Sequence, residues 1–322
     1  MLLPRPEGRG LHAAIPMTSG SPASRIAQLT GLSVREARVA GTQHGYQHLM
    51  LTLAGGRRAF AKVAAAAPAS DGSASDKPAV DEVSAAFAAE ANSLRWLAEA
   101  KAVPVPAVLA VGPGALVIAM IPPGQASAGA AFGFGAELAR LHASGADAFG
   151  APWPGFIASL PLDNTLTPPQ AGSSWPQWYA SRRLLPYLRR ATDSGALRRE
   201  DTRVVETVVD RIDELAGPAE PPSRIHGDCW AGNVLWSGDR GWLIDPAAHG
   251  GHRETDLAML ALFGAPHLDR ILAGYNDTAP LAAGWRARVP LHRLHPLLVH
   301  ACLFGASYRE EVRAAARAAL AG

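Results

Sequence analysis

The polar residues whose types and spacing could do chemistry are concentrated in the segment His226–Asn233 and in Asp245, which follows a short apolar run. Two oxygen ligands, Asn233 and Asp245, suit a hard divalent cation that also holds phosphates. A third group, the Asp228 carboxylate, suits orienting a hydroxyl and accepting its proton. The pattern is typical of phosphoryl transfer to an alcohol, and the alternative is an ordinary turn rich in Asp, Asn and Gly.

A predicted β-hairpin would bring these groups together. The apolar stretches Val234–Trp236 and Trp242–Ile244 flank the turn signal Ser237-Gly238-Asp239. Because the two ends of a hairpin lie side by side, we expect Asn233 and Asp245 to be neighbours.

A candidate phosphate-binding lysine occurs far upstream. Lys62 is one of only three lysines and lies mid-strand in Phe60-Ala61-Lys62-Val63, a pattern like the V-A-I-K strand of kinases. Glu90, on the amphipathic helix predicted over Val83–Ala98, is the expected ion-pair partner. Glu82 and Glu99 compete for that role from positions nearer the helix ends, and a plain surface position is the alternative for Lys62 and Glu90 alike.

The segment from Gly41 to Gly45 lies between the first two predicted strands, where a loop that covers phosphates would belong. It lacks a G-x-G-x-x-G pattern, so an ordinary hairpin turn is an equal alternative.

The order of predicted elements indicates an α+β fold with two lobes. A loose tail (1–23) precedes a strand-rich N-lobe (24–121) with a flexible insert (64–80), and a mainly helical C-lobe (122–322) follows the Pro122-Pro123-Gly124 break. The predicted strands are Arg38–Ala40, Gln47–Leu53, Arg58–Val63, Ala107–Val111 and Ala115–Ile121. The predicted helices are Ser24–Leu32, Val83–Ala98, Ala136–Ala143, Pro176–Leu188, Glu200–Leu215, Glu254–Leu262, Leu268–Tyr275, His292–Phe304 and Tyr308–Leu320.

Composition excludes several classes of protein. With 48% apolar and 18% charged residues the 322-residue chain is globular, and a net charge of +2 does not imply a nucleic-acid partner. The uncharged stretch Ala102–Ala136 contains too many prolines and glycines for a membrane span. The two cysteines, Cys229 and Cys302, fit neither zinc spacing nor a disulfide framework. Without a secretion signal at the N-terminus, we expect a cytoplasmic protein and favour a monomer.

Three histidines, His292, His295 and His300, lie on one predicted helix. Because no carboxylate is near them in the sequence, we expect surface or capping positions and no metal site.

The segments His226–Asn233, Ile244–Ala247 and Gly251–Ala258 together resemble the fructosamine kinase (ketosamine-3-kinase) family, a branch of the aminoglycoside phosphotransferase and choline kinase-like fold. Phe156–Asn164, Trp175–Pro186 and the helix from Phe87 to Leu97 resemble it too, so the resemblance covers about residues 24 to 310.

The resemblance implies a protein kinase-like fold and ATP- and Mg²⁺-dependent phosphorylation of the 3-hydroxyl of ketosamines, which are sugar adducts on free or protein-bound amines. The unstable product then releases the sugar. Ribulosamines and erythrulosamines would be favoured over fructosamines. It further implies the base Asp228, the metal ligands Asn233 and Asp245, and the phosphate-binding Lys62 held by Glu90. The backbone of the hinge strand would contact adenine, through Val117, Ala119, Met120 and Ile121.

The acceptor site is less well defined by the resemblance. Trp230 is a candidate sugar contact or a core residue, and His252, Glu254 and Asp256 are candidates for a supporting role close to the site. His249 and Gly250 stand where the family usually has one or two aromatic residues. Another acceptor, such as an aminoglycoside, an amino alcohol or a sugar, is therefore an alternative. A nucleotide-binding pseudokinase is a third reading, which the complete set of motif residues opposes.

Overall fold

A computed structural model describes residues 21–43, 45–64, 80–167 and 174–322. The chain forms two compact units, the first made of Met1–Phe87 and Val108–Met120 and the second of Ala88–Ala107 and Ile121–Gly322. His44, most of the predicted tail and most of the predicted insert lie outside the described residues. The helix predicted over Val83–Ala98 is observed as α2 (Val80–Glu99), and the two units divide it after Phe87.

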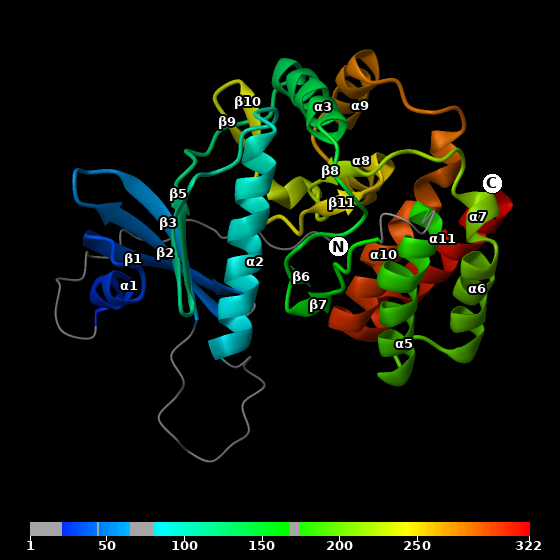
Figure 1. The fold of residues 1–322 in the computed structure, drawn as a ribbon, viewed down its shortest axis with the longest axis horizontal. Helices are drawn as coiled ribbons and strands as arrows, with labels where there is room; N and C mark the ends of the chain where they lie inside the picture. Colours follow the sequence, from blue (N-terminus) through cyan, green and yellow to red (C-terminus); the bar gives the residue numbers. More distant parts are fainter. Residues whose placement is uncertain (1–20, 44, 65–79, 168–173) are drawn as a thin grey trace. The chain divides into compact units, whose positions relative to one another are not determined.

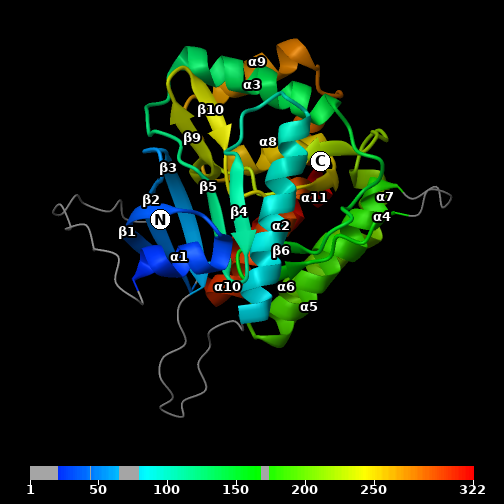
Figure 2. The same ribbon diagram turned by 60° about the vertical axis from the view of Figure 1, so that its left-hand side comes forward.

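The first unit is built on a five-stranded antiparallel sheet with the order β1-β2-β3-β5-β4 (Figures 1 and 2). Its strands are β1 (Val34–Gln43), β2 (Tyr46–Leu53), β3 (Arg58–Ala64), β4 (Val108–Gly112) and β5 (Ala115–Ala119). Helix α1 (Pro22–Thr30) packs on the sheet and buries Ile26 completely. It begins where the Ser21 hydroxyl accepts the Ser24 N–H and ends at Gly31, whose φ of 72° favours glycine.

Strand β1 is longer than the predicted Arg38–Ala40. Its polar residues obscure the alternation expected of a strand, but it pairs with β2 from Val34 to Gln43, with irregularities between Val34 and Glu36 and between Val39 and Gly41. Cross-strand pairing, which a single segment does not reveal, extends it.

Helices α3 (Ala128–Ala143) and α9 (Leu268–Thr278) lie side by side in the second unit (Figures 1 and 2). A Cβ atom on Gly135 would lie 2.0 Å from the Ile271 carbonyl oxygen, and one on Gly274 would lie 2.0 Å from that of Phe132. Any larger residue at either glycine would push the two backbones apart. Against α3 lies the hairpin of β9 (Val234–Ser237) and β10 (Arg240–Leu243).

Helix α8 (Arg253–Leu262) contributes Leu257 and Leu260 to the core shared with α3, α9 and this hairpin, and the other remaining helices of the unit share a separate apolar core. They are α4 (Trp175–Tyr179), α5 (Leu185–Asp193), α6 (Arg199–Asp210), α7 (Ile212–Leu215), α10 (Trp285–Phe304) and α11 (Arg309–Ala321), together with a π-helical turn (Ala180–Leu184) and a 3₁₀ turn (Gly305–Tyr308). The helix predicted over Pro176–Leu188 is continuously helical from Trp175 to Asp193, but it widens into the unpredicted π turn before Pro186, which has no N–H to donate to the preceding turn. The single helix predicted over Glu200–Leu215 is wrong, since it breaks at Arg211.

Four short strands were not predicted as such. β6 (Gly155–Ile157) pairs with β7 (Leu160–Leu162), and β8 (Ser223–Ile225) pairs with β11 (His249–Gly251). Strands of three residues are too short to show an alternating pattern. Of the helices in the described ranges, none combines the length and the apolar character that crossing a membrane would need.

The α+β prediction is confirmed, with an antiparallel sheet in one unit and mainly helices in the other.

Candidate active site

The polar loop lies between two strand pairs of the second unit. β8 ends at Ile225 and β9 begins at Val234, so the loop is held at both ends. β9 and β10 pair Val234 with Leu243, and the Ile244 N–H donates to the Asn233 carbonyl at 3.0 Å. The predicted hairpin is therefore confirmed, and it places Asp245 next to Asn233 at the open end.

Two predicted site residues are in direct contact. The Asn233 side-chain amide donates to the Asp228 carboxylate at 2.8 Å and to the Asp228 carbonyl at 2.9 Å. Asp228 is half-buried and Asn233 is buried. With both amide hydrogens used, Asn233 has its oxygen Oδ1 left to offer, the atom that a hard cation takes.

Asp245 adopts the left-handed backbone conformation, with φ of 53°. This conformation costs an ordinary L-residue about 1–2 kcal/mol, although Asp tolerates it better than most. Strained backbone of this kind concentrates at functional sites. The Asp245 carboxylate and the Oδ1 atom of Asn233 form an all-oxygen donor set, which fits Mg²⁺.

His226 is fully buried and braces the loop from within. Its Nδ1 accepts the Asp228 N–H at 3.2 Å, so Nε2 carries the proton and donates to the Ile244 carbonyl at 2.9 Å. Burial lowers the pKa of His226, although the nearby Asp256 carboxylate acts in the opposite direction. Burial therefore favours the neutral ring. The ring thus ties the backbone of Asp228 to the strand that precedes Asp245.

The Asp256 carboxylate holds the backbone of the same loop. Its two carboxylate oxygens accept the backbone N–H groups of His226 at 2.7 Å and Gly227 at 3.0 Å. His142 contacts Asp256 through Nε2 at 3.1 Å and the Tyr275 hydroxyl through Nδ1 at 2.8 Å. Burial by itself raises the pKa of Asp256, but the hydrogen bond and charge of His142 and the contacts with His226 outweigh it and hold the pKa below its usual value.

The sequence analysis identified Asp256 but missed His142 and Tyr275. Both come from the closely packed helices α3 and α9. The one sequence signal at His142 is a polar residue four positions after the buried Leu138, on the apolar face of a helix.

His249 and Gly250 lie in β11, where little space is left. A Cβ atom on Gly250 would lie 1.9 Å from the Ala148 carbonyl oxygen, so no side chain fits there. His249 is buried against the Trp178 ring at 5.4 Å, and its Nδ1 is 2.8 Å from the Ala247 carbonyl. Burial, followed by the charge of Arg183, lowers the pKa of His249 well below its usual value. These contacts support a packing role for His249.

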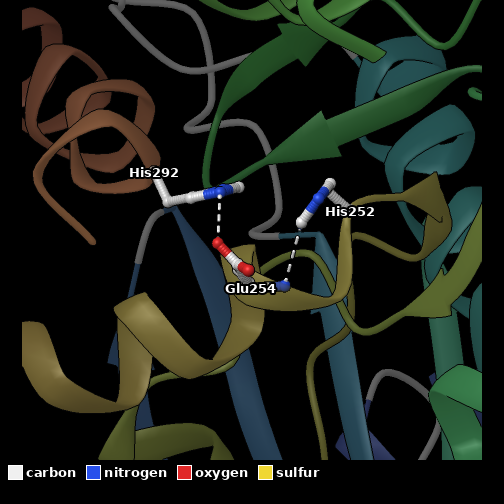
Figure 3. Close-up of side chains that lie close together, drawn as sticks. All are labelled: His252, Glu254 and His292. Atoms are coloured by element: carbon white, nitrogen blue, oxygen red, sulfur yellow. Dashed lines mark hydrogen bonds and ion pairs between the residues drawn. The ribbon is translucent and has the colours of Figure 1, made fainter. Parts of the chain in front are cut away.

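His252 and Glu254 form a buried cluster with His292, shown in Figure 3. Their candidate ligand atoms lie within 4.8 Å of one another. Glu254, however, accepts two hydrogen bonds from Arg288, at 2.9 and 2.5 Å, and its Oε2 lies 3.4 Å from His292 Nε2. Burial would raise the pKa of Glu254, but the hydrogen bonds of His292 and Arg288 lower it to about 2. Since Arg288 already neutralises the carboxylate, these contacts support a structural role.

The expectation of surface or capping positions is wrong for two of the three histidines. His292 is fully buried and His295 is 4% exposed. The carboxylate near His292 comes from α8, which is distant in sequence. His300 is partly buried, and its Nδ1 lies 2.6 Å from the Pro296 carbonyl.

Trp230 is half-buried two residues after Asp228. Its ring lies over Gly232, where an added Cβ would be 2.2 Å from the ring, and meets Phe263 edge-to-face. Trp230 therefore has a defined position beside the loop.

The other predicted residues lie on the sheet unit or on α2. Lys62 is 8% exposed in β3, opposite His48 of β2 and Leu116 of β5. Glu90 is half-buried on the part of α2 that belongs to the second unit. Of the candidate loop residues, Gly41 lies in β1 and Gly45 lies in the turn after it. Of the hinge residues, Val117 and Ala119 lie in β5, and Met120 and Ile121 follow it.

Comparisons with known proteins identify the family. The sequence profile of the family described as fructosamine kinase matches residues 76–321. The "Probable ketoamine kinase YniA" of Escherichia coli (strain K12) is 35% identical over 227 residues, which are 69% of this chain and 76% of that protein. The crystal structure of a "putative fructosamine-3-kinase" from Thermobifida fusca has 49% identity and a TM-score of 0.84, covering 95% of this chain and 100% of that one.

A more distant structure, a macrolide 2'-phosphotransferase from Brachybacterium faecium, has 17% identity and a TM-score of 0.56 over 91% of this chain and 96% of that one, and shows the fold alone. The fold is therefore that of the protein kinase-like phosphotransferases, as the motifs predict. With a profile match over most of its length and a relative 35% identical over 69% of it, the chain belongs to the fructosamine kinase family.

Proposed function

We propose that this protein transfers the γ-phosphate of ATP to the 3-hydroxyl of a ketosamine, and that the unstable product then releases the sugar and restores the amine. The observation that carries the proposal is the contact between Asp228 and Asn233 at 2.8 Å, beside a hairpin that ends at Asp245. Membership of a kinase family and the names of the relatives support the acceptor class.

Asp228 is the proposed general base. Asp228 is half-buried, its carboxylate accepts a hydrogen bond from the Asn233 amide, and its backbone N–H donates to the His226 ring. A carboxylate so placed orients the acceptor hydroxyl and takes its proton as the phosphate ester forms. Trp230 is the proposed wall for the sugar because it follows Asp228 so closely on the same loop.

Asn233 and Asp245 are the proposed ligands of Mg²⁺, which neutralises charge on the ATP phosphates when bound. Lys62 is the proposed phosphate contact, with Glu90 as its partner. The loop from Gly41 to Gly45 is proposed to cover the phosphates. The backbone of the hinge is proposed to contact adenine, through Val117, Ala119, Met120 and Ile121.

A panel of acceptors analysed by mass spectrometry tests the proposal. Ribulose-lysine, erythrulose-lysine, fructose-lysine and an aminoglycoside are each incubated with Mg·ATP and the wild-type protein, with Asp228→Asn as the control variant. We expect a phosphate gained by the ketose-lysines, followed by loss of the sugar, and at least a 10²-fold slower reaction in Asp228→Asn, as roughly expected for loss of a general base. Transfer to the aminoglycoside alone would contradict the acceptor class, and an unchanged rate in Asp228→Asn would contradict the role of the base.

A further inference from the structure

A row of aromatic rings continues from the catalytic loop across the second unit. Trp230 meets Phe263 with ring centroids 6.0 Å apart, and Phe263 meets His300 at 5.2 Å. His300 in turn contacts Phe304 at 5.5 Å and Tyr308 at 4.8 Å. We call these five residues the aromatic row. It links the loop that carries Asp228 to the end of α10.

The row is formed by three separate parts of the chain, the first of which is the catalytic loop with Trp230. Phe263 directly follows α8. His300 and Phe304 lie four residues apart on α10, so they share one face of that helix, and Tyr308 continues the spacing in the 3₁₀ turn that follows. Only tertiary packing brings Phe263 against this face.

Two members of the row are open to solvent. Phe263 is 40% exposed and Phe304 is 56% exposed, the largest exposed fraction among the large apolar side chains of the described residues. Isolated exposed apolar residues are normal on a protein surface, but a contiguous group marks a place where something binds. This group begins at Trp230, two residues after Asp228. Because it continues from the catalytic loop, the molecule it would bind is the acceptor that reacts there.

The row carries no charge at neutral pH. Burial lowers the pKa of His300, whose Nδ1 proton is donated to the Pro296 carbonyl at 2.6 Å. The surface therefore offers aromatic faces and edges, which bind apolar and aromatic groups by stacking and attract organic cations by cation–π contacts.

Building on the proposed function, we infer that the aromatic row binds the amine portion of the acceptor, and that the preferred substrates are ketosamines of amines with an apolar or aromatic substituent. In a ketosamine only three bonds separate C3 from the nitrogen. With the 3-hydroxyl at Asp228, the nitrogen and its substituent would lie beside the same loop, where Trp230 and its neighbour Phe263 form the near end of the row.

Two adducts of one sugar, the ribulosamines of phenethylamine and of methylamine, provide the test. They share the reacting hydroxyl and differ only in the part that would lie on the row. For the wild-type protein we expect a higher kcat/KM with the phenethylamine adduct. In Phe263→Ala, which removes the ring next to Trp230, the ratio of the two kcat/KM values should fall about 3- to 10-fold, since a stacked ring contributes about 0.5–1.5 kcal/mol beyond its burial.

Two further variants make the test specific. Phe263→Tyr keeps the ring and should keep the wild-type ratio. Leu185→Ala, which truncates a 36% exposed apolar residue on α5 outside the row, should not change the ratio. If Phe263→Ala has the wild-type ratio although both adducts are phosphorylated, the inference is refuted and the proposed function stands. If the wild-type protein phosphorylates neither these adducts nor any ketose-lysine of the panel, the proposed function fails and the inference fails with it.

Discussion

Replacing the buried Asp256 with Asn should destabilise the protein and slow its phosphotransfer. Each carboxylate oxygen of Asp256 accepts one backbone N–H of the catalytic loop, from His226 and from Gly227. An amide has only one oxygen. In either orientation of the new side chain, its NH₂ group faces a backbone N–H that Asp256 had satisfied, and the charge that His142 contacts is lost as well.

The magnitude follows from these contacts. A hydrogen bond to a charged group contributes about 1.5–3 kcal/mol, and a donor left buried and unsatisfied costs about 1–3 kcal/mol more. Asp256 is completely buried, so water cannot replace the lost partner. We expect the free energy of unfolding to fall by about 3–5 kcal/mol, and the melting temperature of the affected unit by roughly 6–20 °C.

Calorimetry measures the first effect, and steady-state kinetics well below the melting temperature of the variant measures the second. A displacement of about 1 Å in a catalytic group can cost on the order of 10²-fold in rate, so we expect kcat to fall about 10- to 100-fold. Asp239→Asn makes the same chemical change at an exposed position in the hairpin turn and should alter neither quantity. A variant at Asp256 that melts and turns over like the wild type would refute the role assigned to this carboxylate.

Three further predictions concern other parts of the second unit. The pKa of His249 is well below 6.5 in the folded protein, so the unfolded chain takes up the proton first, and stability should decrease by up to about 1.4 kcal/mol per pH unit below pH 6.5. In urea unfolding from pH 7 to 5, the free energy of unfolding should decrease less in His249→Gln than in the wild type, and as much as in the wild type in the exposed control His267→Asn. Equal pH dependence in His249→Gln and the wild type would contradict this assignment. Gly250→Ala should cost about 3 kcal/mol or more in thermal unfolding, because the added methyl group meets a backbone carbonyl, whereas Gly129→Ala, where nothing lies within 4 Å, should be tolerated. Asp245→Ala should abolish Mg²⁺-dependent ATP binding in calorimetric titration, and retained affinity would show that this residue is not a metal ligand.

The sequence determined the parts of this protein that depend on neighbouring residues. The spacing of Asp228, Asn233 and Asp245, with a turn signal between two apolar stretches, was enough to predict the hairpin and the kind of chemistry. Most helices and the central strands were also predictable, because an apolar periodicity lies within a single segment. The motif residues were likewise sufficient to indicate the family that the comparisons then showed.

Tertiary structure decided the contacts between segments that are distant in the chain. Tyr275, His142 and Asp256 lie on three different helices, and their contact depends on the close approach of α3 and α9. The burial of His292 against Glu254 was predicted wrongly for the same reason, since its partner is on another helix. Local propensity and hydrophobic pattern act over a few residues and can be read from them, whereas burial and side-chain partners depend on which surfaces pack together, and that is settled only when the whole chain folds.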